Sequence, residues 1–338
     1  VFPGEPAWKA GLREGDKILQ IGDVKNPVFR DLQTGVALGD HIDEGVDFVV
    51  QRAGVEEPLK LKIFPRRRKL LPQIGMSNGD TCEVLAVAAK RLDDVAPGLS
   101  KIKPGDVIVA VNGEPVTEGW QVDRVLSRNV GPVSCAIERT IRDEAQPNDA
   151  PRRERVDVEL PAIPMRTVGL IMAMGKITAV QQGSPAEAAD IRAGDKIKSI
   201  GGEEPGDPMR LGRHLADRKE AAAMIVVERD GRDLQKQLDL DLDAVDNTAP
   251  DPLLDAENIP IAVPALGVAI EVENRVAHVE SGSAAAAAGV KAGDEIVKAR
   301  LLPADPEIQR EKYDVKQPQE KPDELDFEGK RNWPLLFA

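Results

Sequence analysis

The stretch GSPAEAADIRAGDKIKSIGG at residues 183–202 decides the fold of this chain. Ser184 and Pro185 are typical of the start of a helix, where serine caps the first turn and proline occupies its first position. The pair Gly194-Asp195 predicts a turn, and the apolar residues that follow it predict a strand. The stretch therefore predicts a short helix, a tight turn and a strand in succession.

The same pattern occurs three more times in the 338 residues. It reads PGEPAWKAGLREGDKILQIG at residues 3–22, APGLSKIKPGDVIVAVNG at 96–113 and GSAAAAAGVKAGDEIVKA at 282–299. The marker aspartates are Asp16, Asp106, Asp195 and Asp294, and we number the copies as repeats one to four in this order. A spacing of about 90 residues is too long for a solenoid repeat and indicates a series of small domains.

A second helix is predicted after each marked strand. The residues 16 and 20 positions beyond the marker aspartate are apolar in three repeats, as Leu32 and Val36, Val122 and Leu126, and Leu211 and Leu215. Apolar residues spaced in this way lie on one face of a helix. A hairpin follows, at residues 46–52 and 59–64 in repeat one and at 224–229 and 234–242 in repeat three. In repeat two, residues 142–155 predict a long polar connection.

A glycine marks a strand entry ahead of three repeats, at residues 73–76, 168–171 and 266–269. We expect each entry to serve the marked helix that follows it. The predicted domains are 1–65, 70–162, 165–243 and 263–338, with a linker at 244–262 and an insertion at 303–330. Repeat one is predicted to lack its entry and repeat four its closing hairpin, so we interpret the chain as a part of a longer protein.

The composition excludes several classes of protein. Asp and Glu number 58 against 45 Lys and Arg, a net charge of -13, which argues against a nucleic-acid partner. Six Phe, three Trp and one Tyr are too few for base-stacking platforms. No apolar run approaches the roughly 20 residues of a membrane-spanning helix. Cys82 and Cys135 cannot make a disulfide framework, although one bridge between them stays open.

No catalytic motif is found in the chain. The three histidines, His41, His214 and His278, are too widely spaced in sequence for a zinc motif such as His-Glu-x-x-His. No serine lies in a Gly-x-Ser-x-Gly segment, and neither cysteine has a neighbouring histidine. We therefore predict no catalytic residue, no metal ligand and no cofactor in this chain.

The glycine entry, the GSPA helix start, the Gly-Asp turn and the second helix together resemble PDZ domains of the bacterial type. The resemblance implies an α+β fold, an array of small, partly open β-barrels or sandwiches with two helices each. In that family the C-terminal or extended segment of a peptide or protein adds as a strand beside the strand that follows the glycine loop. Backbone N–H groups of the loop hold the terminal carboxylate, and the second helix covers a side-chain pocket.

The resemblance also implies the peptide-binding residues. The loop positions are Ile74, Gly75 and Met76; Val168, Gly169, Leu170 and Ile171; and Leu266, Gly267 and Val268. The helix walls are Val122 and Leu126 in repeat two and Leu211, His214 and Leu215 in repeat three. The sequence leaves open whether the apolar helix residues line a groove or only the core, and whether His214 contacts a ligand or only solvent.

The segment at residues 3–18 and the acidic repeats also look like the PDZ region of site-2-type membrane zinc metalloproteases. This resemblance implies a non-catalytic, substrate-filtering or regulatory part of a metalloendopeptidase of intramembrane proteolysis. It would lie at the extracytoplasmic (periplasmic) face of the membrane, with the membrane protease domain as partner and the zinc in that separate domain. Two alternatives are the PDZ region of a trypsin-like serine protease and a non-enzymatic PDZ scaffold.

Overall fold

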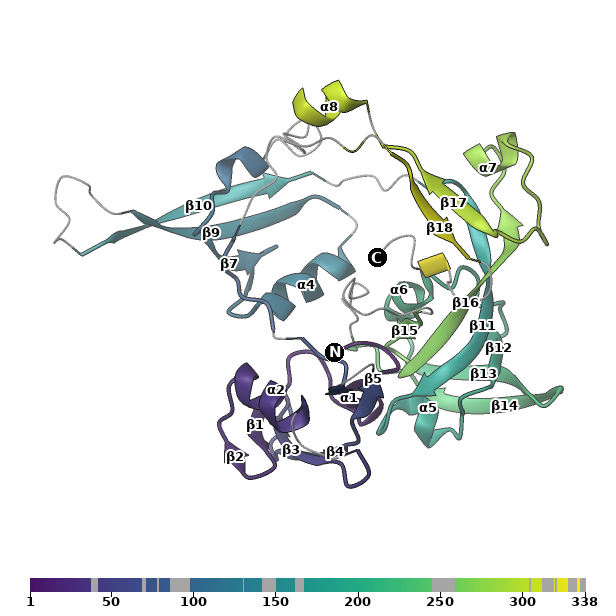
Figure 1. Ribbon diagram of the computed structural model, residues 1–338, viewed down its shortest axis with the longest axis horizontal. Coiled ribbons are helices and arrows are strands. Elements are labelled where there is room, and N and C mark those ends of the chain that lie inside the picture. Colours follow the sequence, from purple (N-terminus) through teal and green to yellow (C-terminus); the bar gives the residue numbers. More distant parts are fainter. Residues whose placement is uncertain are drawn as a thin grey trace. The chain divides into compact units, whose positions relative to one another are not determined.

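The structure is a computed structural model that describes residues 1–37, 42–68, 71–77, 79–85, 98–129, 131–141, 150–161, 167–244, 259–303, 305–311, 319, 321–327 and 333–334. The chain forms two compact units. The first comprises Val1–Asn78, Val168–Lys298 and Asp326–Ala338, and the second comprises Gly79–Thr167 and Ala299–Leu325. Small sheets and short helices alternate in both (Figure 1). The predicted α+β class is confirmed.

Repeat one, in the first unit, follows the predicted order of elements. It contains α1 (Pro6–Lys9), β1 (Lys17–Ile21), β2 (Val24–Lys25), α2 (Phe29–Ala37), β3 (Val46–Gln51) and β4 (Leu59–Ile63). The strands form a sheet of order β2-β1-β3-β4. Two further short strands, β5 (Arg66–Arg68) and β6 (Leu71–Gln73), pair with each other and lead to Gly75.

Repeat two, in the second unit, has the same order of strands and a longer hairpin. It contains the 3-10 helix η1 (Leu99–Lys101), β7 (Val107–Val111), β8 (Glu114–Pro115), α4 (Gly119–Arg128), β9 (Val133–Ile141) and β10 (Arg152–Leu160). The predicted connection at 142–155 is too long at its C-terminal end. Arg152 pairs with Ile141 and Arg155 with Glu138, because the register of β9 and β10 continues that far.

Repeat three, in the first unit, contains α5 (Pro185–Ala188), β12 (Lys196–Ile200), α6 (Leu211–Ala216), β13 (Ala222–Arg229) and β14 (Arg232–Asp239). The sheet has the order β12-β13-β14. Asp230 and Gly231 join β13 to β14 with φ of 52° and 73°, the left-handed values that a two-residue hairpin of this kind requires. The predicted hairpin is therefore confirmed.

Repeat four is built around a long strand. It contains β15 (Ile261–Val263), β16 (Val268–Val279), α7 (Ala284–Ala287) and β17 (Lys298–Leu301). The predicted insertion at 303–330 contains α8 (Pro306–Glu311) and β18 (Asp323–Asp326), and β18 pairs with β17. The predicted linker at 244–262 ends in structure, since Ile259 is buried and β15 begins at Ile261; residues 245–258 lie outside the described part.

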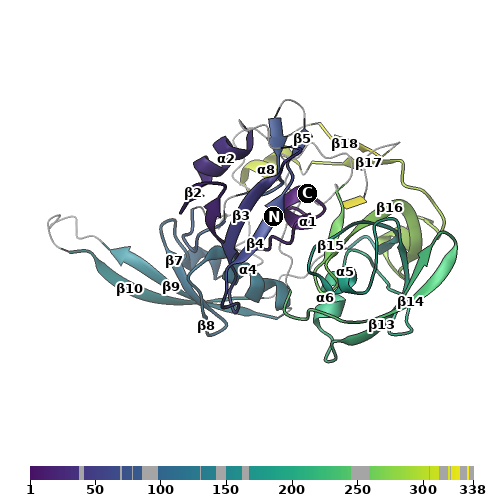
Figure 2. The same cartoon turned by 90° about the horizontal axis from the view of Figure 1, so that it is seen from below.

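Two long strands connect repeats three and four. β11 (Leu170–Val180) pairs antiparallel with β16 from Leu170 opposite Val279 to Val180 opposite Val268, and the two ribbons lie side by side in Figures 1 and 2. The register shifts between several of the pairs, so the ribbon bends along its length. The C-terminal half of β11 packs into one core through Ile177, and its N-terminal half packs into another through Met172.

Each marker aspartate is fixed by its own turn. In all four repeats, the carboxylate accepts a hydrogen bond from the backbone N–H three residues earlier, at 2.7–2.9 Å. These bonds close the Gly-Asp turns. In repeats one, two and three an arginine near the end of the hairpin's first strand adds two further bonds, from Arg52 to Asp16, Arg139 to Asp106 and Arg229 to Asp195.

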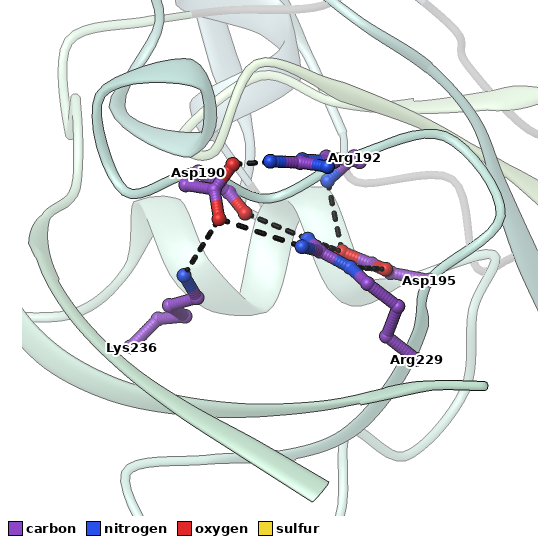
Figure 3. Close-up of polar contacts among 5 residues, drawn as sticks. All are labelled: Asp190, Arg192, Asp195, Arg229 and Lys236. Carbon is purple, nitrogen blue, oxygen red and sulfur yellow. Dashed lines mark hydrogen bonds and ion pairs between the residues drawn. The ribbon is translucent and has the colours of Figure 1, made fainter. Parts of the chain in front are cut away.

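In repeat three this pair belongs to a small network (Figure 3). Arg229 binds Asp195 through Nε and Nη2, at 2.7 and 2.8 Å, and its Nη2 also donates to the carbonyl of Asp190 at 2.7 Å. Burial opposes ionisation of Asp195, but the hydrogen bonds from Arg229 and the Arg192 N–H outweigh it and lower its pKa. Hydrogen bonds from Arg192 and Lys236 lower the pKa of Asp190 to about 2. The turn, the end of α5 and β13 are thus held together.

Both cysteines are free thiols in the second unit. Cys82 and Cys135 are buried in one apolar cluster with Val111 and Ile137. Burial raises the pKa of both thiols, and Glu118 and Asp123 raise that of Cys82 further. The disulfide that the sequence left open is not formed.

The buried pair predicts how repeat three responds to mutation and to acid. Asp195 is 1% exposed, so Arg229→Met leaves a buried charge without its partner and should lower the free energy of unfolding by about 3 kcal/mol at pH 7. Because the pKa of Asp195 is lower in the folded protein, its stabilising effect is present above the unfolded pKa of about 3.9 and is lost as the pH falls toward the folded value. The variant should therefore lose less stability than the wild type on acidification below pH ~4.

Urea unfolding at pH 7 and below pH ~4, monitored by hydrogen exchange of β12 and β13, measures both the loss of stability and its pH dependence. The control is Lys198→Met, which breaks the ion pair between Lys198 and Glu228. The side chains of this pair are 46% and 40% exposed. It should change stability by less than about 1 kcal/mol. Equal effects of the two variants would show that the Asp195 pair does not hold the repeat together.

Candidate functional site

Three glycine loops share one geometry in the structure. In repeat three, Ala186 of α5 donates its N–H to the carbonyl of Leu266 at 3.0 Å, and Gln181 donates to the carbonyl of Gly267 at 2.8 Å. The loop therefore accepts one hydrogen bond from the second residue of the helix and another from the residue five positions before it in the chain. This double contact places the loop against the N-terminus of a helix.

The other two loops repeat these bonds. In repeat one, Ala7 donates to the Ile74 carbonyl at 2.8 Å and Phe2 to the Gly75 carbonyl at 2.9 Å. In repeat four, Ala285 donates to the Val168 carbonyl at 3.0 Å, and Glu280 donates to the Gly169 carbonyl at 2.9 Å. The three sites are equivalent residue by residue.

Glycine is required in these loops for two reasons. Gly75, Gly169 and Gly267 have φ of 73°, 80° and 71°, in the left-handed region that side chains disfavour. A β-carbon at Gly267 would also collide with the side chain of Ser184, the N-cap of α5, whose hydroxyl accepts the Glu187 N–H at 3.2 Å. The loop is thus packed directly on the capping residue.

The loops do not serve the helices that we expected. The entry at 73–76 contacts α1 of repeat one, and the entry at 266–269 contacts α5 of repeat three, so each serves an earlier helix. The entry at 168–171 contacts α7 of repeat four, far beyond the helix that follows it. The physical reason for the last two is that β11 and β16 run past each other as single strands, and each carries its glycine loop to the other repeat's helix.

The strand after the Gly267 loop has neighbours on both edges. Val268, Ala269 and Ile270 of β16 pair with Val180, Ala179 and Ile177 of β11. The same three residues pair with Val263, Ala262 and Ile261 of β15, so β15 occupies the opposite edge.

The strand after the Gly169 loop is paired differently. Leu170 and Ile171 of β11 pair with Val279 and His278 of β16 on one edge. β11 is the edge strand of its sheet, and within the described part of the chain no strand pairs with Leu170 or Ile171 on the other edge. Val168 beside them is 50% exposed.

The predicted helix walls divide between core and surface. Leu211 and Leu215 of α6 are each 1% exposed and share a core with Val263, Leu266 and Ile270, while His214 points to the exposed side. In α4, Val122 is buried and Leu126 is 41% exposed. The structure therefore brings Leu211, Leu215 and the loop at 266–268 together, whereas Val122 and Leu126 belong to the other compact unit.

Two features of the site were missed by sequence reasoning. The arginines that bind the marker aspartates, Arg52, Arg139 and Arg229, recur 33 to 36 residues after them, and that recurrence was a usable signal. The boundary predicted between linker and repeat four divided strand β15, with Ile261 and Ala262 in the linker and Val263 in the repeat, although this apolar run was visible in the sequence.

Comparison with known proteins identifies the domain type. Residues 176–229, from the second half of β11 to the end of β13, match the family model described as PDZ domain. This part of the chain is a PDZ domain. A stretch of 73 residues is 37% identical to "Probable protease eep" of Enterococcus faecalis (strain ATCC 700802 / V583), covering 22% of this chain and 16% of that protein. The chain thus matches only a small part of that relative.

A solved structure was also found. It is the crystal structure of a PDZ domain protein from Parabacteroides distasonis ATCC 8503, 11% identical to this chain. The alignment covers 70% of this chain and 91% of that chain, with a TM-score of 0.20. In the described part of this chain there is no group of three metal-ligating side chains and no helix with the length and apolarity needed to span a membrane. The predicted domain bounds stay predictions.

The Gly267 loop, which contacts α5 of repeat three, offers a test of this geometry. A non-glycine residue in the left-handed region costs about 1–2 kcal/mol by itself. Gly267→Ala should lower the free energy of unfolding of the first unit by more than this, because the added methyl group also collides with Ser184. The matched control is Gly183→Ala, whose φ is 72° but whose β-carbon would have no heavy atom within 4 Å. Unfolding in urea compares the two variants. Similar losses of stability would mean that the loop can move away from α5.

Proposed function

We propose that the chain is an array of PDZ-type modules that bind extended or C-terminal segments of peptides and proteins. The PDZ domain at 176–229 supports peptide binding, and the equivalent loop contacts in repeats one and four support the same role for these repeats. PDZ domains bind a peptide as an added strand, in which main-chain bonds supply affinity and pockets supply specificity. Short peptides with a free C-terminal carboxylate are therefore the probes that test this proposal.

The observation that carries this proposal is the strand edge at Leu170 and Ile171. It follows directly on the Gly169 loop, and no described strand covers it. On the equivalent edge of β16, β15 is already added in antiparallel register, so the strand after such a loop can accept an extended apolar segment. A peptide on β11 would run toward the Gly169 loop with its C-terminus, where backbone N–H groups can bind a carboxylate.

We also propose that these modules serve a protease. The similarity of 73 residues to a protein named as a probable protease supports this role. The proposal extends to the sequence-based expectation of a membrane-embedded zinc metalloprotease, with these modules at its extracytoplasmic face as a substrate filter. The full-length protein should then contain apolar membrane segments and a His-Glu-x-x-His helix that binds zinc. A Gly-x-Ser-x-Gly segment upstream would instead identify a trypsin-like protease. If the full-length protein contains neither motif, the array is a non-enzymatic scaffold.

Calorimetric titration of the full chain tests peptide binding. The full chain is needed, because β11 and β16 are shared between repeats three and four. Peptides with an apolar C-terminal residue should bind with a Kd of about 1 μM, or about 8 kcal/mol. Amidation of the C-terminus should weaken binding roughly 10- to 100-fold, since hydrogen bonds to a charged group contribute about 1.5 to 3 kcal/mol.

Two variants place the site. Val168→Asp adds a negative charge beside the Gly169 loop. It should weaken binding of the free-acid peptide more than binding of the amidated peptide, because only the free acid carries a terminal negative charge. Val24→Asp on β2 is the control, because Val24 is similarly exposed, at 47% against 50% for Val168, and belongs to repeat one. Equal binding of both peptide forms contradicts carboxylate capture, and equal effects of the two variants contradict the assignment to β11.

A further inference from the structure

The strand-addition edge of repeat three is already filled by the chain itself. β15 pairs with the three residues that directly follow the Gly267 loop, with Val263 opposite Val268 and Ile261 opposite Ile270. It is antiparallel, and its C-terminal end points into the loop. A peptide added to a PDZ domain has this same edge, direction and end.

The side chains of this segment fill the space between sheet and helix. Val263 is fully buried, Ala262 is 5% exposed, and Val263 shares a core with Leu211 and Leu215 of α6. The fit against α6 is close, since a β-carbon at Gly212 would lie 3.3 Å from Pro264 and 3.5 Å from the Ala262 carbonyl. β15 therefore lies between β16 and α6, where the second helix of a PDZ domain covers its ligand.

We propose that Ile259–Val263 is a resident ligand that closes the groove of repeat three, and that an external apolar segment of the same kind exchanges with it. This proposal rests on the peptide-binding function proposed above and describes how that binding is regulated. Because Ile259–Val263 fills the groove, the preferred external ligand should resemble it, as a short run of β-branched and small residues. The groove of repeat three is then latent, whereas no described strand covers the edge of β11 at Leu170 and Ile171.

Covalent attachment determines how strongly the groove is closed. Only the turn at residues 264–267 separates β15 from β16, so β15 competes at an effective concentration of about millimolar or more. An external peptide with an intrinsic Kd of about 1 μM would therefore bind roughly 1,000-fold more weakly at this groove than at an open one. Loosening β15 should restore the affinity.

Hydrogen exchange of the full chain tests this proposal directly. The probe is the free-acid hexapeptide Asn-Ile-Pro-Ile-Ala-Val, which copies residues 258–263. At millimolar probe, residues 259–263 should lose protection while residues 268–270 keep theirs, because the probe replaces β15 on the same edge. Unchanged protection of 259–263 overturns the proposal, and so does a joint loss at 259–263 and 268–270, which indicates local unfolding.

A variant gives an independent measurement. Ile261→Ser removes apolar surface from a half-buried side chain of β15 and leaves the glycine loop unchanged. It should raise the affinity of the probe for repeat three about tenfold. The control Ile18→Ser changes a half-buried isoleucine of β1 in repeat one and should leave that affinity unchanged. Equal affinity in both variants contradicts the proposal; if Ile261→Ser does not fold, the exchange experiment on the wild type decides.

The two proposals fail in different ways. Protection gained at residues 170–172 with no change at 259–263 would leave the peptide-binding function intact and remove the resident ligand. Absence of any probe-dependent protection would contradict both. Displacement of β15 with retained protection at 268–270 supports both.

Discussion

The rest of the structure depends on a buried carboxylate held by an arginine from a distant strand. Asp195 closes the turn after α5 through the Arg192 N–H, and Arg229 ties that turn to β13. Because Asp195 is buried, it would destabilise the fold without these bonds, and with them it fixes the relative positions of helix, turn and sheet. Asp16 and Asp106 are held in the same way by Arg52 and Arg139. Repeats one, two and three share this bond.

On this frame, the path of two strands determines the binding edges. β11 and β16 pair along their lengths, so each contributes to two cores and delivers its glycine loop to the neighbouring repeat. One edge after a loop, at Val268–Ile270, is covered by β15, and the equivalent edge at Leu170–Ile171 is not covered by any described strand. Among the described residues, two sites with the same loop geometry therefore differ in whether a strand pairs with their edge.

Part of the candidate site was predictable and part was not. The glycines 75, 169 and 267 were identified from their recurrence, and the structure explains them by their φ values and by contact with an N-cap residue. The helix positions 211 and 215 were placed on one face, but their burial with Val263 depends on β15, which was not predicted as a strand. A three-residue strand has too short a pattern to be distinguished from a connecting segment.

The sequence by itself determined the local units: the capped helices, the Gly-Asp turns, the second helices and the Asp230-Gly231 hairpin. These follow from interactions between residues close in the chain, so spacing and residue type are sufficient. Only the tertiary structure decided which glycine loop packs on which helix and which edge is filled. The three loops and their three helix starts make equivalent contacts. The partners of the Gly169 and Gly267 loops are set by strand pairing between residues about 90 to 110 positions apart, which no local pattern encodes.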